Sequence, residues 1–144
     1  MSRPDPFVPL NAAPLSDLQV LVVDDQANAL NLIKDMLKSM GVESVLTAPD
    51  AAGALDLLKD RKDLVDVVLC DWSMPQMSGL ELLKEVRKTH RDLPFMMVTG
   101  TADPASVLAA KDGGVTGYIR KPFSSEELRK KMTSVARVKA FRIS

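Results

Sequence analysis

The chain alternates short apolar runs with segments in which apolar residues recur every three or four positions. The first run, residues 20–23 (VLVV), is apolar throughout and mostly β-branched, which is typical of a strand buried on both faces of a parallel sheet. The next segment places Leu30, Ile33 and Leu37 on one side of a helix, and Gly41 follows as a helix-ending residue. This alternation constrains the fold more than any other property of the sequence.

The same unit recurs to the end of the chain. Further strands are predicted at 44–48, 67–70, 95–98 and 116–119, each followed by an amphipathic segment. Residues that favour helix starts precede the later helices: Asp50, Ser78 with Glu81, Asp103 with Pro104, and Ser124 with Glu127. The pattern predicts an α/β fold, a doubly wound five-stranded parallel sheet with helices on both faces.

The composition fits one domain preceded by a tail. Residues 1–17 contain Pro4, Pro6, Pro9 and Pro14 without hydrophobic periodicity, and they predict a flexible proline-rich tail before a domain at 18–144. The 19 basic and 19 acidic residues cancel, which argues against nucleic acid or an anionic membrane as the main partner. We see no signal peptide or membrane span, so the expected location is cytoplasmic.

Polar residues follow the predicted strands at the point where each strand ends. Asp24 and Asp25 follow the first strand, Asp71 the third, Thr99 the fourth, and Lys121 lies just after the fifth. The carboxyl ends of parallel strands meet at one edge of the sheet, where open α/β sheets bind their ligands. We therefore expect these five side chains to lie close together.

This set of residues is compatible with phosphoryl chemistry. Three converging carboxylates repel one another, and a bound cation relieves the repulsion. A ligand set made of oxygens alone favours a hard ion such as Mg²⁺. A carboxylate such as Asp71 can attack a phosphoryl group, while Lys121 neutralises charge on the transferred oxygens and Thr99 donates a hydrogen bond to them.

Four motifs, in order and at successive strand ends, resemble the receiver domains of two-component response regulators. They are residues 22–25 (VVDD), 71–79 (DWSMPQMSG), 97–100 (MVTG) and 118–123 (YIRKPF). The resemblance covers about residues 18–140, and the loop after Asp71 is similar to that of stand-alone chemotaxis receivers. Two positions depart from those receivers, because Ser73 stands where asparagine is common and Thr101 where an acidic residue is frequent.

The resemblance implies a flavodoxin-like (βα)5 fold with strand order 2-1-3-4-5, and it implies a role for each matching residue. Asp71 matches the phosphoacceptor, and Thr99 and Tyr118 match the two switch residues. Lys121 matches the phosphate-pairing lysine, and its bond to Pro122 matches a cis peptide. The ligands implied for Mg²⁺ are Asp24, Asp25, Asp71 and the backbone carbonyl of Ser73.

The implied function is a signalling switch rather than a conventional enzyme. A sensor histidine kinase or phosphotransfer protein would supply the phosphoryl group, and the domain would catalyse its own phosphorylation and dephosphorylation. Phosphorylation would then change a face built from the fourth helix, fifth strand and fifth helix, which binds a downstream protein target.

Three alternatives stay open from the sequence. An aspartyl-phosphate phosphatase would need a second aspartate two residues after Asp71, where the chain has Ser73. A flavin-binding electron carrier would need a glycine- and hydroxyl-rich loop where Asp24 and Asp25 stand. A degenerate receiver would act as a scaffold without phosphorylation. The basic run 129–131 is interpreted as a solvated helix face rather than a binding patch.

Overall fold

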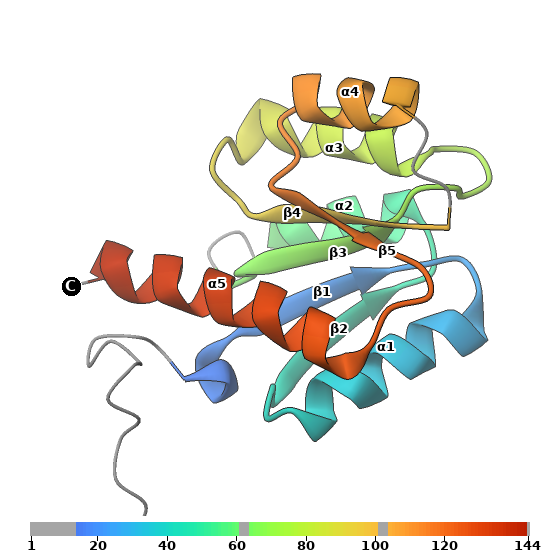
Figure 1. The fold of residues 1–144 in the computed structure, drawn as a ribbon. Helices are drawn as coiled ribbons and strands as arrows, with labels where there is room; N and C mark the ends of the chain where they lie inside the picture. Colours follow the sequence, from blue (N-terminus) through green and yellow to red (C-terminus); the bar gives the residue numbers. More distant parts are fainter. Residues whose placement is uncertain (1–13, 61–63, 101–103, 144) are drawn as a thin grey trace, which may run out of the picture.

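A computed structural model describes residues 14–60, 64–100 and 104–143, with side chains described as far as Lys139. In this part of the chain one parallel sheet has the strand order β2-β1-β3-β4-β5 (Figure 1). The strands are β1 (Gln19–Val23), β2 (Ser44–Ala48), β3 (Val67–Asp71), β4 (Phe95–Thr99) and β5 (Gly117–Arg120). The predicted fold class and strand order are confirmed.

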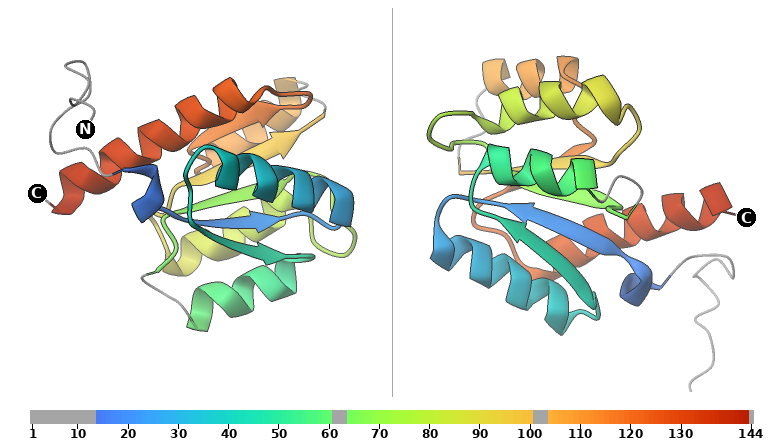
Figure 2. Two further views of the ribbon diagram at one scale, coloured as in Figure 1. Left: turned by 90° about the horizontal axis from the view of Figure 1, so that it is seen from below. Right: turned by 180° about the vertical axis from the view of Figure 1, so that it is seen from behind.

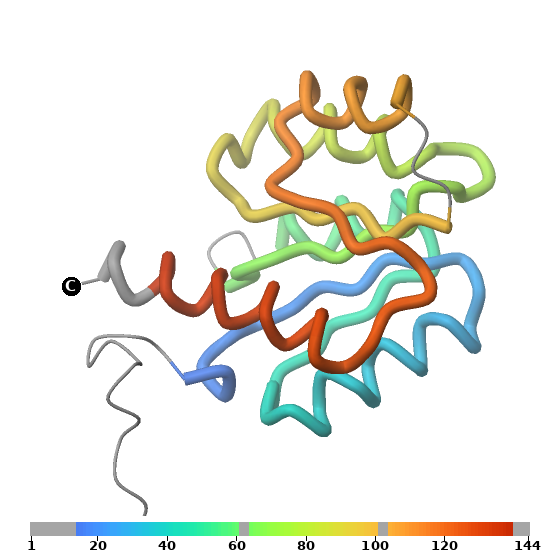
Figure 3. The backbone as a smooth tube through the Cα atoms, in the orientation of Figure 1, coloured from blue at the N-terminus to red at the C-terminus, as the bar shows by residue number. Residues whose placement is uncertain are grey.

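Helices cover both faces of the sheet (Figures 1 and 2). On one face lie α1 (Ala27–Ser39) and α5 (Ser125–Ile143), and on the other lie α2 (Ala51–Asp60), α3 (Gly79–Thr89) and α4 (Pro104–Asp112). Figure 3 follows the chain through these alternating strands and helices. Each connection therefore returns the chain to the same starting edge of the sheet.

The central strands are apolar at successive positions because both of their faces are buried. In β1, Val20 and Val22 pack toward α1 and α5, whereas Leu21 and Val23 pack toward α2 and α3. All four side chains are fully buried. This is the pattern from which the sequence predicted a two-sided parallel sheet.

Side-chain caps begin three helices at predicted positions. The hydroxyl of Ser78 accepts a hydrogen bond from the Glu81 amide at 3.2 Å. The corresponding caps of α2 and α5 are Asp50 with the Gly53 amide at 2.7 Å and Ser124 with the Glu127 amide at 3.1 Å. The predicted cap Asp103 lies outside the described residues. These caps satisfy amide donors that the first helical turn leaves unpaired.

A short 3₁₀ helix, η1 (Leu15–Asp17), lies within the range that the sequence predicted as tail. Leu15 packs against the core beneath α5, and the Lys139 ammonium donates to the Asp17 carbonyl at 2.7 Å. Lys139 also pairs with Asp66 at 3.1 Å. The packed part of the chain therefore begins before Leu18, while residues 1–13 of the predicted tail lie outside the description.

No helix in the described ranges is long and apolar enough to cross a membrane.

Two leucines on α1 allow a test of how much packing against the sheet stabilises the fold. Leu37 is fully buried against the sheet, whereas Leu32 on the same helix is 60% exposed. We predict that Leu37→Ala lowers the free energy of unfolding by about 2–5 kcal/mol, because it leaves a cavity in the core. The matched control Leu32→Ala is expected to change it by less than about 0.5 kcal/mol. Urea unfolding measures both, and equal losses in the two variants would contradict the packing described.

Candidate functional site

Three carboxylates meet at the carboxyl edge of the sheet. Strands β1 and β3 are neighbours, with Val23 opposite Cys70, so Asp24 and Asp71 occupy the next positions of adjacent strands. Carboxylate oxygens of Asp24, Asp25 and Asp71 lie within 4.8 Å of one another. The predicted convergence of these residues is thus a property of the strand pairing.

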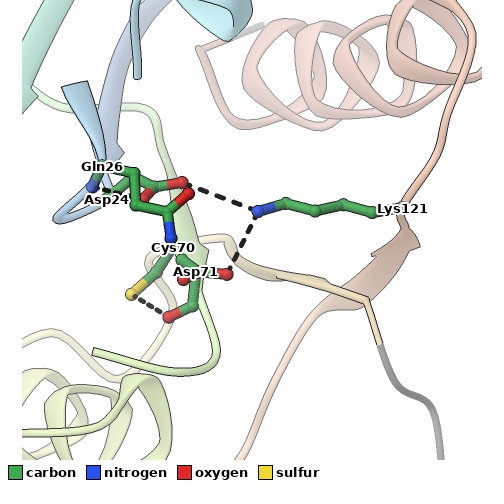
Figure 4. Close-up of polar contacts among 5 residues, drawn as sticks. All are labelled: Asp24, Gln26, Cys70, Asp71 and Lys121. Atoms are coloured by element: carbon green, nitrogen blue, oxygen red, sulfur yellow. Dashed lines mark hydrogen bonds and ion pairs between the residues drawn. The ribbon is translucent and has the colours of Figure 1, made fainter. Parts of the chain in front are cut away.

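Lys121 completes the cluster from the far side of β4. Its ammonium lies 3.4 Å from Asp71 Oδ1 and 3.7 Å from Asp24 Oδ2 (Figure 4). Its backbone amide donates to the Thr99 carbonyl at 2.7 Å, and the Lys121–Pro122 peptide is cis, as the family resemblance implied. The lysine is therefore anchored through its backbone while its side chain reaches across to two carboxylates.

Asp24 is the most deeply buried member of the cluster, with 2% of its surface exposed. Its Oδ1 accepts a hydrogen bond from the Gln26 amide at 2.9 Å (Figure 4). Its Oδ2 is buried and has no hydrogen-bond donor among the described residues, because the Lys121 ammonium is at ion-pair distance only. A buried carboxylate oxygen without a donor is costly. Such an oxygen, beside two further carboxylates, suits a bound cation.

The electrostatic environment of Asp71 favours its neutral form. Burial is the main cause of a raised pKa for the Asp71 carboxyl, and the charges of Asp24 and Asp25 raise it further. Lys121 acts in the opposite direction through its charge and its hydrogen bond. The Asp71 side chain keeps 15% of its surface exposed, so a reactant can approach it.

Cys70, the residue before Asp71, has an inert thiol. Burial raises the pKa of the Cys70 thiol far above its ordinary value, and the charges of Asp71 and Asp24 add to this effect. The thiol donates a hydrogen bond to the Asp71 carbonyl at 3.2 Å (Figure 4). Cys70 therefore remains protonated and serves as a small buried side chain beneath the site.

The loop between β3 and α3 folds back over Asp71 and requires a glycine to do so. The Gly79 amide donates to the Trp72 carbonyl at 2.9 Å. A Cβ at Gly79 would lie 2.6 Å from the Asp71 carbonyl oxygen, which no side chain can tolerate. Gln76 in the same loop has a φ of 71°. Ser73 lies exposed in this loop, two residues after Asp71.

The two predicted switch residues occupy different places. Thr99 is 3% exposed at the end of β4, one position beyond Val98, which is opposite Asp71. Tyr118 lies on β5, away from the carboxylates, and its hydroxyl donates to the backbone carbonyl of Val107 in α4 at 2.8 Å. Of the seven predicted site residues, the structure groups five at the sheet edge, places Ser73 in the loop after Asp71, and connects Tyr118 to α4.

Two contributors to the site were missed by sequence reasoning. The Gln26 amide holds Asp24, and Gly79 permits the loop above Asp71, although Gly79 was quoted as part of a motif. The signal for the first is an aspartate at a strand end, whose side chain commonly accepts from the amide two residues later. The signal for the second is a glycine directly after a helix cap.

The electrostatics of the cluster lead to a prediction about Asp71→Asn. Because the folded state raises the pKa of Asp71 above its ordinary 3.8, the ionised carboxylate destabilises the fold. In EDTA at pH 7 the variant is expected to be more stable than the wild type, because it carries no charge at position 71. This gain in stability should shrink as the pH falls through the folded-state pKa of Asp71, since the wild-type carboxyl then becomes protonated in the folded and in the unfolded state. Urea unfolding between neutral and acidic pH measures this, and a gain that grows on acidification would contradict it.

Known proteins resemble this chain in sequence and in fold. Residues 20–133 match the model of the response regulator receiver domain family. The chain is 42% identical over 120 residues to a chemotaxis protein CheY homolog of Campylobacter jejuni, covering 82% of this chain and 92% of that protein. Among solved structures, a Clostridium thermocellum receiver domain has a TM-score of 0.81 at 29% identity, covering 86% of this chain and 98% of that one. Vibrio cholerae CheY4 has a TM-score of 0.74 at 34% identity, covering 82% and 98%. The chain belongs to the response regulator receiver domain family of two-component signalling.

Proposed function

We propose that this receiver domain is a phosphorylation switch that takes a phosphoryl group onto Asp71. The observation that carries the proposal is the position of the Lys121 ammonium, 3.4 Å from Asp71 and 3.7 Å from Asp24. The site therefore has a partly exposed carboxylate with a fixed positive charge beside it, and transfer of an anionic phosphoryl group requires both. The expected donor is a sensor histidine kinase or a phosphotransfer protein.

The carboxylate cluster suits Mg²⁺ as the cofactor of this transfer. Asp24, Asp25 and Asp71 would hold the ion, with the backbone carbonyl of Ser73 as a further oxygen ligand. Asp24 Oδ2, which has no hydrogen-bond donor in the described part of the chain, supports this assignment. When bound, Mg²⁺ neutralises charge on phosphoryl oxygens and lowers the repulsion among the carboxylates.

In the transfer step, a carboxylate oxygen of Asp71 attacks phosphorus. The new bond joins that oxygen to phosphorus, and the bond from phosphorus to the donor's imidazole nitrogen breaks, after which the imidazole takes a proton from water. The Lys121 ammonium pairs with the phosphoryl oxygens in place of Asp71 Oδ1. In dephosphorylation, water accepts the phosphoryl group and the bond between phosphorus and the Asp71 oxygen breaks. The free carboxylate is restored, so the domain returns to its unphosphorylated state.

The output of the switch is proposed to pass through Thr99 and Tyr118. Thr99 follows Val98 at the end of β4, and its hydroxyl would donate to the phosphoryl group on Asp71. Its backbone carbonyl already accepts from the Lys121 amide, so a shift at Thr99 affects the chain leading out of β5. Tyr118 on β5 holds α4 through its hydroxyl. The face of α4, β5 and α5 would thereby bind a downstream target differently in the two states.

Intact mass spectrometry with a small-molecule phosphodonor such as acetyl phosphate tests the proposal. We expect a single phosphoryl adduct that requires Mg²⁺, because the acidic cluster repels the donor without it. Asp71→Asn removes the nucleophile and is expected to abolish the adduct. Lys121→Met keeps the nucleophile but loses the positive charge, and a fall in adduct formation of about 10²-fold or more is expected.

Two controls separate the competing functions. Asp25→Asn leaves Asp71 intact and should raise the Mg²⁺ concentration needed for the adduct without moving its position. Continuous hydrolysis of phosphate esters by the wild type would indicate an aspartyl-phosphate phosphatase. An adduct that survives Asp71→Asn would contradict the assignment, and a wild type without any adduct at saturating Mg²⁺ would favour the scaffold.

Tyr118→Phe tests the connection between β5 and α4. The substitution removes the hydroxyl that donates to the Val107 carbonyl at 2.8 Å, while the ring stays in place. One lost hydrogen bond of about 1 kcal/mol is expected to speed hydrogen exchange in α4 roughly fivefold in the unphosphorylated protein. Amides of α1 serve as the internal control. Unchanged exchange in α4 would show that the hydroxyl does not hold this helix.

A further inference from the structure

The guanidinium of Arg87 connects the ends of two helices. Arg87 lies in the last turn of α3, and its Nε and Nη2 both donate to the Gly114 carbonyl, at 3.0 and 2.8 Å. Its Nη1 donates at 2.8 Å to the carbonyl of His90, the residue that caps the end of α3. Gly114 belongs to the turn that follows α4. A planar guanidinium with donors in fixed directions therefore bridges the C-terminal ends of α3 and α4.

The turn after α4 lies directly against Arg87. The Gly114 amide donates to the Lys111 carbonyl at 3.1 Å, and the Val115 amide donates to the Ala110 carbonyl at 3.0 Å. These bonds, with a φ of 90° at Gly114, form the glycine-based ending that is common in helices. A Cβ at Gly114 would lie 3.2 Å from Arg87 Nε. Glycine thus lets the guanidinium approach the backbone closely at this end of α4.

The same end of α4 is fixed by two further contacts. Ala110 is fully buried, and it is the one buried residue of α4, a helix that the structure describes from end to end. A Cβ at Gly113 would lie 3.2 Å from Leu83 Cδ2, so the turn packs closely on α3 (Figure 1). Beyond the turn, the Thr116 amide donates to the Phe95 carbonyl at 2.8 Å, and the Thr116 hydroxyl accepts from the Phe95 amide at 2.9 Å. Both α3 and β4 therefore hold the chain where α4 ends.

The N-terminal half of α4 is packed less tightly than its C-terminal end. Leu108 is 58% exposed, and Val107 is partly buried. The Val107 carbonyl accepts a hydrogen bond from the Tyr118 hydroxyl at 2.8 Å. A helix that is packed at one end and exposed at the other opens locally from its exposed end. The contact with Tyr118 thus acts on the half of α4 that is easier to move.

We propose that Arg87 makes the C-terminal end of α4 a fixed pivot, so that release of the Tyr118 hydroxyl frees the N-terminal half of the helix alone. A change at Tyr118 then tilts α4 and does not detach it, and the turn between α4 and β5 keeps its place. The trigger rests on the proposed function, because phosphorylation of Asp71 is what would move Tyr118. The pivot itself belongs to the unphosphorylated fold.

Hydrogen exchange resolved to single amides by NMR, on unphosphorylated protein, tests the pivot. The amides of residues 108–109 report the N-terminal half of α4, and those of residues 113–115 report the clamped end. Tyr118→Phe is expected to speed exchange about fivefold at 108–109 and to leave 113–115 unchanged. Arg87→Met keeps an unbranched side chain but donates no hydrogen bond, and it should speed exchange about tenfold at 113–115.

A double variant and two controls complete the design. In the Arg87→Met background, Tyr118→Phe should speed exchange at 113–115 by a further factor of about five, because the helix is no longer held at that end. Lys84→Met removes an exposed positive charge from the same helix, α3, and should leave all of these amides unchanged. Arg87→Lys keeps the charge but loses the forked donors, so its effect at 113–115 should be smaller than that of Arg87→Met.

Three outcomes would overturn the pivot. The first is unchanged exchange at 113–115 in Arg87→Met, or in Arg87→Lys if Arg87→Met also speeds exchange in α1 and so loosens the whole fold. The second is Tyr118→Phe acting on 113–115 as strongly as on 108–109 while Arg87 is present. The third is Tyr118→Phe without effect on 108–109.

The result is separable from that of the proposed function. No measurement in this design uses phosphorylated protein, so a failure of Asp71 to accept a phosphoryl group would contradict the switch and leave the test of the pivot intact. Arg87→Met is expected to form the phosphoryl adduct as the wild type does, because the contacts of Arg87 lie at the ends of α3 and α4 and not in the carboxylate cluster.

Discussion

The ion-pair arrangement of Lys121 between Asp71 and Asp24 depends on the strand order of the sheet. β1 and β3 are adjacent, so their terminal aspartates meet, while Lys121 follows β5 at the edge and reaches back across β4. A parallel sheet brings all of these strand ends to one side. The helices matter to the site chiefly because they cover both faces of the strands and keep these ends in register.

The cluster is electrostatically unfavourable in itself. Asp24 is buried with one oxygen lacking a donor among the described residues, and Asp71 has a raised pKa. A bound cation or a phosphoryl group would change the net charge at this cluster of buried carboxylates. A large response to a small covalent change follows naturally from such a site, provided that another element has two arrangements. We propose that the hydroxyl contact between Tyr118 and α4 is that element.

The sequence predicted the fold well because its strongest signals are periodic. A fully apolar run such as residues 20–23 fits only a strand that is buried on both faces. A helix cap such as Ser78 contacts a residue that is close to it in the sequence. The order of the strands came from the resemblance to receiver domains and not from periodicity, since pairing joins residues that are distant in the chain. Helix η1 was missed because three residues carry no periodic signal, and its contact with Lys139 spans 122 positions.

The site residues were predictable as a group, whereas their supporting contacts were not. Strand ends place Asp24, Asp71 and Lys121 together once the sheet is assumed to be parallel. The hydrogen bond from the Gln26 amide and the close approach of Gly79 to the Asp71 carbonyl have only weak sequence signals, because both depend on the exact course of the backbone.

The proposed switch depends on Asp71 as the residue that carries the phosphoryl group. Borohydride reduction converts an acyl phosphate of aspartate to homoserine, and peptide mass spectrometry then locates the converted residue. We expect homoserine at position 71, formed only in protein treated with phosphodonor and Mg²⁺. Homoserine at position 24 or 25, or a phosphoryl group that resists reduction because it lies on a hydroxyl or an imidazole, would contradict it.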